Sequence, residues 1–216
     1  MPVDPQIQAL LDKGTGVPAT HTLPVDVARA QYEARVVLMA SAAEIADVRE
    51  QTIDGPGGPL RIRIYTPHGR GPFPLLVFFH GSGFVLCSLD THDGMCRNLC
   101  AGAGCVVASV DYRLAPEHKF PAGIDDRLYA TRWAAAHAAE LGANPMRVAV
   151  AGDSAGATMA AVHRPPSTRR GRSVLTRSAA ALSGDRLPYV WHSLILGERR
   201  GLSTDPRHDE VVLRII

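Results

Sequence analysis

The 216-residue sequence has no uninterrupted apolar stretch near the roughly 20 residues that a membrane-spanning helix requires. Its first residues, MPVDPQIQALLDK, hold an early acid but no basic lead and no apolar run, so no signal peptide is predicted. An excess of one charge is also lacking, because 23 Lys and Arg face 21 Asp and Glu. That balance predicts neither a nucleic-acid partner nor a membrane-surface partner. We therefore expect a soluble, cytoplasmic protein.

Cysteine is scarce, and all four residues lie in one short stretch, at Cys87, Cys96, Cys100 and Cys105. No CxxC pair is present, so neither a zinc ribbon nor a disulfide framework is predicted. Cys96 and Cys100 would lie one helical turn apart, a spacing that permits metal binding, but buried apolar packing is the commoner fate of a free cysteine. A chain of this length can bury enough surface to fold without such cross-links. We expect no metal and no cofactor.

The hydrophobic pattern changes along the chain and predicts an α/β fold. Apolar residues recur at helical spacing within residues 1–45, and this segment is predicted as an N-terminal helical cap. Apolar runs then alternate with helix-forming stretches over 46–161, which predicts a mostly parallel sheet with helices on both faces. The predicted strands are Val48–Ile53, Arg61–Tyr65, Leu75–Phe79, Val106–Val110 and Val148–Ala151, and the predicted helices run from about Asp90 to Gly102 and from Ile124 to Ala139.

Ser154 is the candidate nucleophile, at the centre of Gly152-Asp153-Ser154-Ala155-Gly156. A serine hydroxyl needs both a base and a geometry that presents it to a scissile carbonyl. Gly-x-Ser-x-Gly supplies the geometry, because small flanking residues let a strand turn sharply into a helix with the serine at its tip. The pattern alone recurs by chance, and an ordinary Gly-Asp-Ser turn is the simplest alternative. The preceding apolar strand and the helix-forming run after it favour the catalytic interpretation.

A second glycine motif, His80-Gly81-Ser82-Gly83-Phe84, directly follows the predicted strand that ends at Phe79. Ester attack creates an oxyanion that must be met by preoriented backbone N–H groups, and a loop of small residues can turn its amides toward such an oxygen. A plain glycine-rich turn with a core histidine is the alternative. The presence of two such elements, each after a buried strand, makes coincidence a poor explanation.

Together these segments resemble the bacterial hormone-sensitive-lipase-like carboxylesterases, which have the α/β-hydrolase fold. The resemblance also rests on Leu89-Asp90-Thr91-His92-Asp93, on Asp111-Tyr112-Arg113-Leu114-Ala115-Pro116-Glu117-His118 and on Phe120-Pro121-Ala122. It covers residues 48–161, with a weaker echo in the N-terminal helices, which help to cap the acyl pocket in that family.

The resemblance implies a role for each matching residue. Ser154 would be the nucleophile, and the backbone amides of Ser82, Gly83 and Ala155 would form the oxyanion hole. His80 would organise the loop and would not be the base, while Asp111 and Arg113 would brace their own turn. The family usually has glycine where this chain has Ser82, and a Cβ there would restrict the loop if its φ is positive.

A working triad needs an acid and then a histidine after the serine. Asp185 with His192, and Asp205 with His208, have that order. Neither pair has the intervening strand and loop that would position a base against Ser154, so the acid and the base stay unassigned. In the family these groups lie in an Asp-Pro-Leu-like motif and a late His-Gly motif, and this sequence has only a faint echo of the first.

Residues 162–216 change character, becoming rich in Arg, Pro and Ser with little periodicity, and they are predicted as an atypical, partly disordered tail. We therefore consider the hypothesis that the reading frame shifts after about Ala161 and the family's C-terminal strands are missing. Translating the other two frames downstream of that codon tests it. On this hypothesis Val148–Ala151 would be an open, apolar sheet edge.

Two functions follow from these residues. The first is a serine carboxylesterase or lipase-type hydrolase that acts on short to medium acyl esters through an acyl-enzyme intermediate. The second is a catalytically inactive α/β-hydrolase remnant that at most binds acyl ligands. A small-molecule ester is the expected partner, and a homodimer is left open. A dinucleotide-binding domain is disfavoured because no glycine fingerprint follows the first strand.

Overall fold

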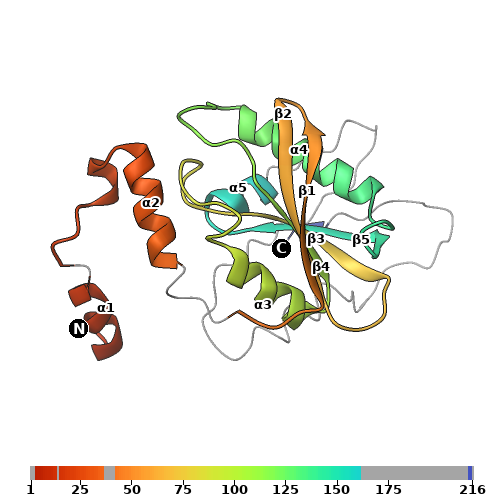
Figure 1. The fold of residues 1–216 in the computed structure, drawn as a ribbon, viewed down its shortest axis with the longest axis horizontal. Coiled ribbons are helices and arrows are strands. Elements are labelled where there is room, and N and C mark those ends of the chain that lie inside the picture. Colours follow the sequence, from red (N-terminus) through yellow and green to blue (C-terminus); the bar gives the residue numbers. More distant parts are fainter. Residues whose placement is uncertain (1–2, 14, 37–41, 162–213, 216) are drawn as a thin grey trace.

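The computed structural model describes residues 3–13, 15–36, 42–161 and 214–215 and centres on one sheet (Figure 1). Six strands pair in the order β1-β2-β4-β3-β5-β6. Their bounds are Asp47–Gly55 for β1, Gly58–Thr66 for β2, Phe73–Phe79 for β3, Val106–Val110 for β4, Ala143–Gly152 for β5 and Arg214–Ile215 for β6. Each of the five strands expected from the sequence is present.

Strand direction makes the sheet mixed but mostly parallel. The hairpin of β1 and β2 is antiparallel and joins β4 antiparallel, whereas β3 runs parallel to both β4 and β5. In register, Phe79 at the end of β3 lies between Val110 at the end of β4 and Gly152 at the end of β5. The three carboxyl ends therefore meet at one edge, where ligands bind in open α/β sheets.

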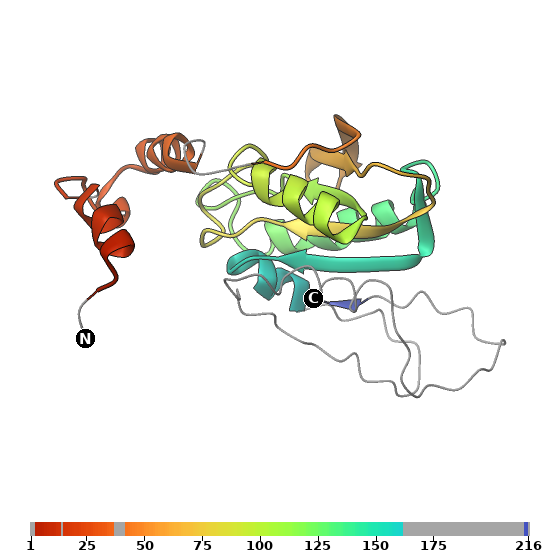
Figure 2. The same cartoon turned by 90° about the horizontal axis from the view of Figure 1, so that it is seen from below.

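Helices cover both faces of this sheet, as the sequence predicts. They are α3 (Asp93–Ala103), α4 (Ala122–Ala136) and α5 (Ala155–Ala161). Along β3, Leu75, Val77 and Phe79 pack in a cluster with residues of α4 and α5, while Leu76 and Phe78 pack in a second cluster with cysteines of α3. Successive side chains of a strand point to opposite faces. The continuous apolar run of β3 thus lies between two helical layers (Figure 2).

Helices α3 and α4 begin or end at residues other than those predicted from the hydrophobic pattern. Helix α3 begins three residues late, because the Thr91 side chain accepts a hydrogen bond from the Ser88 amide and holds residues 88–91 in a turn. Helix α4 ends at Ala136 and not Ala139, and the chain then turns through Gly142 with φ 72°. Asn144-Pro145, a pair that disfavours helix, already lies in β5.

The edge at Val148–Ala151, which would be open if the C-terminal strands were missing, is paired at its two central residues. Strand β6 pairs parallel to β5, with Arg214 opposite Ala149 and Ile215 opposite Val150. The short strand supplies backbone partners to the apolar strand that precedes Ser154. Most of the predicted tail, residues 162–213, lies outside the described residues.

The N-terminal segment forms α1 (Pro5–Lys13), a 3-10 turn at Thr20–Thr22 and α2 (Val25–Val36), set to one side of the sheet (Figure 1). Arg29 attaches α2 to the core. Its guanidinium donates hydrogen bonds to the Val85 carbonyl, the Ala115 carbonyl and both Glu117 carboxylate oxygens, at 2.8–3.0 Å. Helix α2 therefore contacts the loops at the carboxyl edge of the sheet.

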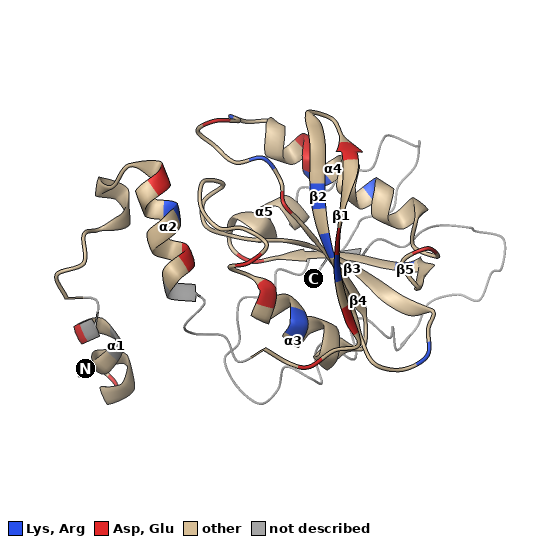
Figure 3. Cartoon of the chain, viewed as in Figure 1, with Lys and Arg blue, Asp and Glu red and all other residues tan. Residues whose placement is uncertain are grey.

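Charged residues of both signs are mixed along α2, α3 and the β1–β2 hairpin (Figure 3). Ion pairs join several of them, among them Arg61 with Asp111 and Arg97 with Asp93. No helix among the residues that the structure describes is long and apolar enough to cross a membrane.

Candidate active site

Ser154 lies at the tip of the turn between β5 and α5. Its φ is 48°, in the left-handed region that non-glycine residues rarely adopt, and its side chain is exposed. The Asp153 carbonyl accepts a hydrogen bond from the Gly156 amide at 2.8 Å, and the Ser154 carbonyl accepts one from the Thr158 amide at 3.0 Å. These bonds start α5 directly after the serine. This is the strained, exposed presentation that a nucleophile between a strand and a helix requires.

The two flanking glycines are required by close packing against the end of β3. A Cβ at Gly156 would lie 1.8 Å from the Phe79 carbonyl oxygen, and one at Gly152 would lie 2.4 Å from the same oxygen. Both distances are far inside van der Waals contact with backbone that cannot rotate away. The Gly-x-Ser-x-Gly spacing therefore fixes how closely α5 approaches β3.

The glycine loop that follows β3 packs against the serine turn. A Cβ at Gly81 would lie 2.2 Å from Asp153 Oδ2 and 2.8 Å from the Asp153 carbonyl oxygen. Gly81 therefore lets the loop backbone approach the residue just before Ser154. Beyond it, Ser82 and Gly83 carry φ values of 73° and 68°. The two motifs that the sequence places after separate strands are brought together.

Ser82 has a positive φ, the backbone conformation that the glycine usual at this position in the family would adopt without strain. The left-handed region costs a non-glycine residue roughly 1–2 kcal/mol. Phe84 and Cys87 also have positive φ, at 65° and 74°. The Cys87 thiol donates a hydrogen bond to Ser82 Oγ at 3.0 Å, so side-chain contacts hold a loop that glycine would leave free.

His80 lies fully buried beneath the glycine loop and is not placed to act as a base. Its ring stacks on Tyr112 with centroids 4.5 Å apart, and its carbonyl accepts a hydrogen bond from the Tyr112 hydroxyl at 2.7 Å. Burial, assisted by the neighbouring His92, lowers the pKa of His80 to about 4. The ring is therefore neutral at pH 7, which fits the loop-organising role that the resemblance implies.

A half-buried pair of His92 with Asp153 adjoins the serine turn, and sequence reasoning did not single it out. His92 Nε2 lies 3.2 Å from Asp153 Oδ1. Burial opposes the charge of each, but contacts with Asp153 and Cys87 raise the pKa of His92 to about 9, and contact with His92 lowers the pKa of Asp153. The only signal in the sequence was the segment 89–93, which carried resemblance but no assigned role.

The 111–122 loop is braced through two separate acid–arginine pairs. Asp111 accepts two hydrogen bonds from the Arg61 guanidinium, the shorter at 2.7 Å. Arg113 binds the buried Asp126 with its guanidinium and its backbone amide, at 2.8–3.1 Å. The loop also donates the Ala115 amide to the Phe84 carbonyl at 2.9 Å, which ties it to the end of the glycine loop.

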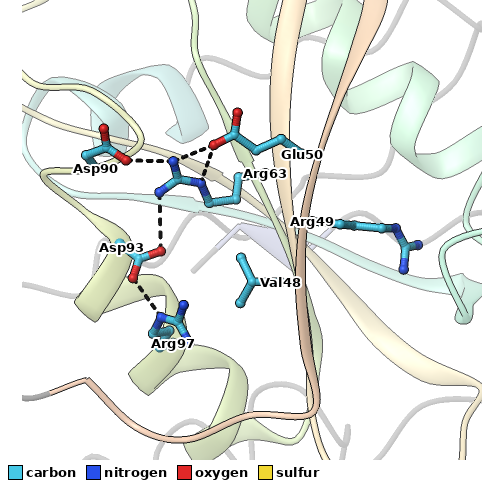
Figure 4. Close-up of a pocket in the computed structure, with 7 residues that line it drawn as sticks. All are labelled: Val48, Arg49, Glu50, Arg63, Asp90, Asp93 and Arg97. Carbon is cyan, nitrogen blue, oxygen red and sulfur yellow. Dashed lines mark hydrogen bonds and ion pairs between the residues drawn. The ribbon is translucent and has the colours of Figure 1, made fainter.

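A hollow of 520 Å³ lies away from these motifs, between the β1–β2 hairpin and α3 (Figure 4). Arg63 is at its centre, hydrogen-bonded to Glu50, Asp90 and Asp93, and Asp93 also pairs with Arg97. The guanidinium is neutralised by carboxylates from three segments. Val48 is the one apolar residue that lines this open, charged surface, whereas an acyl chain needs a mainly apolar lining.

The triad acid and base remain unidentified in the described part of the chain. Asp185, His192, Asp205 and His208 lie outside it, and no histidine among residues 3–13, 15–36 or 42–161 is hydrogen-bonded to Ser154. The roles of Ser154 and of the Ser82, Gly83 and Ala155 amides stay predictions. The described cysteines are free, and no cluster of His, Cys, Asp or Glu with metal-binding geometry occurs in the described ranges.

Known proteins share both the sequence and the fold of this region. Residues 76–179 match the family described as alpha/beta hydrolase fold, so the match extends past Ala161. Esterase LipI of Mycobacterium tuberculosis is 54% identical over 118 residues, covering 53% of this chain and 37% of LipI. Carboxylic ester hydrolase LipN of the same organism is 44% identical over 165 residues, covering 74% of this chain and 44% of LipN.

The structure of a known esterase is also similar to the structure of this chain. The hyperthermophilic esterase of Pyrobaculum calidifontis superposes with a TM-score of 0.68 at 43% identity, over 75% of this chain and 52% of that one. The chain spans less than half the length of LipI or LipN. The predicted resemblance is confirmed: the chain has the α/β-hydrolase fold, and over its matched residues it is similar to proteins named as esterases and carboxylic ester hydrolases.

Proposed function

We propose that this chain carries the nucleophile and oxyanion-binding half of a serine carboxylesterase that acts on short to medium acyl esters. Ser154 attacks the ester carbonyl, and the backbone N–H groups of Ser82, Gly83 and Ala155 receive the negative charge on the oxygen. The alcohol leaves, and water then hydrolyses the acyl-enzyme. The names of LipI and LipN, an esterase and a carboxylic ester hydrolase, support an ester as the substrate.

One observation carries this proposal. Ser154 is exposed with φ 48° at the carboxyl edge of the sheet, and Gly81 brings the glycine loop against the adjacent Asp153. A serine in an ordinary turn would need neither the strained φ nor the glycines that pack on Phe79. The arrangement supports a hydroxyl presented beside amides that can bind an oxyanion.

A second candidate function is favoured because no histidine among the described residues is hydrogen-bonded to Ser154. Without a base the serine hydroxyl stays protonated, and only residual catalysis from oxyanion stabilisation and binding remains, about 10³–10⁴-fold over water. The chain would then be a catalytically inactive remnant that at most binds acyl ligands. The cytoplasmic location and the homodimer stay predictions under either function.

The test compares the full chain with its Ser154→Ala variant, using a chromogenic butyrate ester at fixed protein concentration. Ser88→Ala is the matched control, because it removes a hydroxyl from a nearby loop outside the proposed machinery. An esterase predicts hydrolysis that Ser154→Ala reduces by several orders of magnitude and Ser88→Ala preserves. Equal rates for the chain and Ser154→Ala would end the proposal, and the remnant would be the better description.

A further inference from the structure

Arg29, on α2, binds two loops that are far from it in the sequence. Its Nε donates a hydrogen bond to the Val85 carbonyl at 2.8 Å, and its Nη2 donates one to the Ala115 carbonyl at 3.0 Å. The guanidinium also holds both carboxylate oxygens of Glu117 in a bidentate pair, at 2.8 and 2.9 Å. The planar fork of the guanidinium is therefore fixed in one orientation against the glycine loop and the 111–122 loop.

The charged pair and the carbonyl contacts of Arg29 do different things. The side chains of Arg29 and Glu117 are 27% and 52% exposed, and an ion pair this exposed adds little to stability. Their hydrogen bond lowers the pKa of Glu117 to about 2 and raises the pKa of Arg29, so both groups are ionised at neutral pH. The two bonds to backbone carbonyls instead fix the orientation of loop peptides next to a full positive charge.

The Val85 carbonyl belongs to a peptide group that is hydrogen-bonded at both ends. That peptide joins Val85 to Leu86, and the Leu86 amide donates to the Ser82 carbonyl at 3.2 Å. The Ser82 carbonyl belongs in turn to the trans peptide that joins Ser82 to Gly83. The C=O and N–H of a planar trans peptide point in opposite directions. The bond from Leu86 therefore fixes the direction of the Gly83 N–H, one of the predicted oxyanion donors.

A second path leads from Arg29 to the same carbonyl. The Ala115 amide donates to the Phe84 carbonyl at 2.9 Å. The peptide that joins Phe84 to Val85 then donates the Val85 amide to the Ser82 carbonyl at 3.3 Å. Arg29 holds Ala115 through its own carbonyl. Both paths end on the Ser82 carbonyl, so the guanidinium constrains the peptide that follows Ser82 from two sides.

We propose that Arg29 is a positioning residue for the oxyanion loop, which aligns and polarises the Gly83 amide from α2 through two peptide groups. The cation draws electron density from the Val85 carbonyl, so the Leu86 N–H becomes a stronger donor. The Gly83 N–H gains in the same way, because hydrogen bonds in series strengthen one another by about 10–30% per bond. The consequence for ester hydrolysis rests on the proposed function, whereas the alignment of the loop does not.

The loop needs outside support because its backbone is strained. Ser82 and Phe84 have φ values of 73° and 65°, and such residues keep this conformation only where surrounding structure holds them. The Cys87 thiol holds the Ser82 side chain, whereas the bonds to the Ser82 carbonyl lead back to Arg29. The same guanidinium thus attaches α2 and supports the loop, so detachment of α2 disorders the proposed oxyanion donor.

The first test needs no esterase activity and compares the full chain with its Arg29→Ala variant by NMR. We expect the Leu86 amide to exchange its hydrogen at least about tenfold faster in the variant, because the peptide beyond it has lost its anchor. The Gly83 amide proton should move upfield as its peptide loses polarisation. Should Arg29→Ala not fold, Arg29→Gln, which is shorter and neutral, gives the same readouts. Unchanged exchange at Leu86, or an unmoved Gly83 resonance, would overturn the proposal.

Two controls separate this series of hydrogen bonds from general loosening. Arg49→Ala removes a β1 arginine with an exposed ion pair, and it should leave the loop amides unchanged. Glu117→Ala removes the bidentate partner but leaves both carbonyls to Arg29, so exchange in α2 should rise while the Leu86 amide stays protected. Equal loss of Leu86 protection in Glu117→Ala and Arg29→Ala would mean that the position of α2, and not the bonds to the carbonyls, protects the loop. That result would also overturn the proposal.

The consequence for hydrolysis is measured as kcat and KM on a chromogenic butyrate ester. A poorly aligned donor weakens the transition state more than the bound substrate, so Arg29→Ala should lower kcat about tenfold and leave KM within about twofold. Loss of a whole oxyanion donor costs more, about 10²–10³ in kcat. An effect confined to KM would show that Arg29 serves substrate binding, against the proposal. If the full chain and Ser154→Ala hydrolyse the ester at equal rates, the proposed function fails, and the NMR readouts still decide whether Arg29 positions the loop.

Discussion

Replacing Gly156 by alanine tests how tightly the serine turn is packed. The added Cβ would lie 1.8 Å from the Phe79 carbonyl oxygen, 2.6 Å from the Phe79 carbonyl carbon and 2.9 Å from the His80 carbonyl oxygen. All three contacts are backbone atoms, so no side-chain rotation relieves them. Overpacking a core commonly costs about 1–3 kcal/mol, and we expect a loss of about 3 kcal/mol or more here. For a chain of this size that lowers the melting temperature by roughly 6–12 °C.

The assay is thermal and urea unfolding followed by circular dichroism. Gly102→Ala is the matched control, because Gly102 also lies in a helix but a Cβ there meets nothing within 4 Å. Alanine is the better helix former, so that change should be neutral or stabilising by up to about 1 kcal/mol. A Gly156→Ala protein as stable as Gly102→Ala would refute the close approach of α5 to β3.

Three further predictions concern charges. Asp126→Ala leaves Arg113 without its partner and should cost about 3 kcal/mol of unfolding free energy in urea titrations. Stability should be greatest near pH 6.5. Above pH 6.5 the free energy of unfolding falls by about 1.4 kcal/mol per pH unit toward pH 9, because folded His92 keeps a proton that the unfolded chain releases. Below pH 6.5 the free energy of unfolding falls again toward pH 4, because the unfolded chain protonates His80 while the folded protein keeps it neutral. Arg29→Ala should raise hydrogen exchange in α2 while leaving β3 and β5 protected.

Each of these has an internal control. Asp125→Ala, at an exposed neighbour of Asp126, should change stability by less than about 0.5 kcal/mol. His92→Gln should flatten the stability profile between pH 6.5 and 8.5 but leave the acid limb unchanged. Equal slopes in the two proteins would mean that the His92–Asp153 pair does not hold the extra proton. Unchanged exchange in α2 after Arg29→Ala would show that other contacts attach it.

The parts of the fold that sequence predicts well are those set by local pattern. The apolar run that ends at Phe79 has no polar face, and this pattern predicts a central strand. Strand β4 was predicted with its observed ends. The serine turn was predictable because two glycines at fixed spacing report a backbone constraint. The predicted N-terminal limit of α3 was wrong, because hydrogen bonds between Ser88 and the Thr91 side chain hold the residues before Asp93 in a turn.

The His92–Asp153 pair could not be predicted in this way. Its members belong to different loops, and their contact depends on the register of the sheet, which brings the end of β5 beside the end of β3. A periodic pattern reports which face a residue occupies but not which loop lies opposite. The acid and base of the triad stay unassigned for the same reason, because no local spacing ties a distant histidine to Ser154.

Backbone strain in the described residues is concentrated at one edge of the sheet. All four non-glycine residues there with positive φ, Ser82, Phe84, Cys87 and Ser154, lie in the glycine-loop segment or the serine turn. Such conformations cost of order 1–3 kcal/mol each and persist only where surrounding structure holds them. Here the parallel strands and the close glycine contacts supply that support. Of the four side chains, only that of Ser154 is required by the proposed ester chemistry.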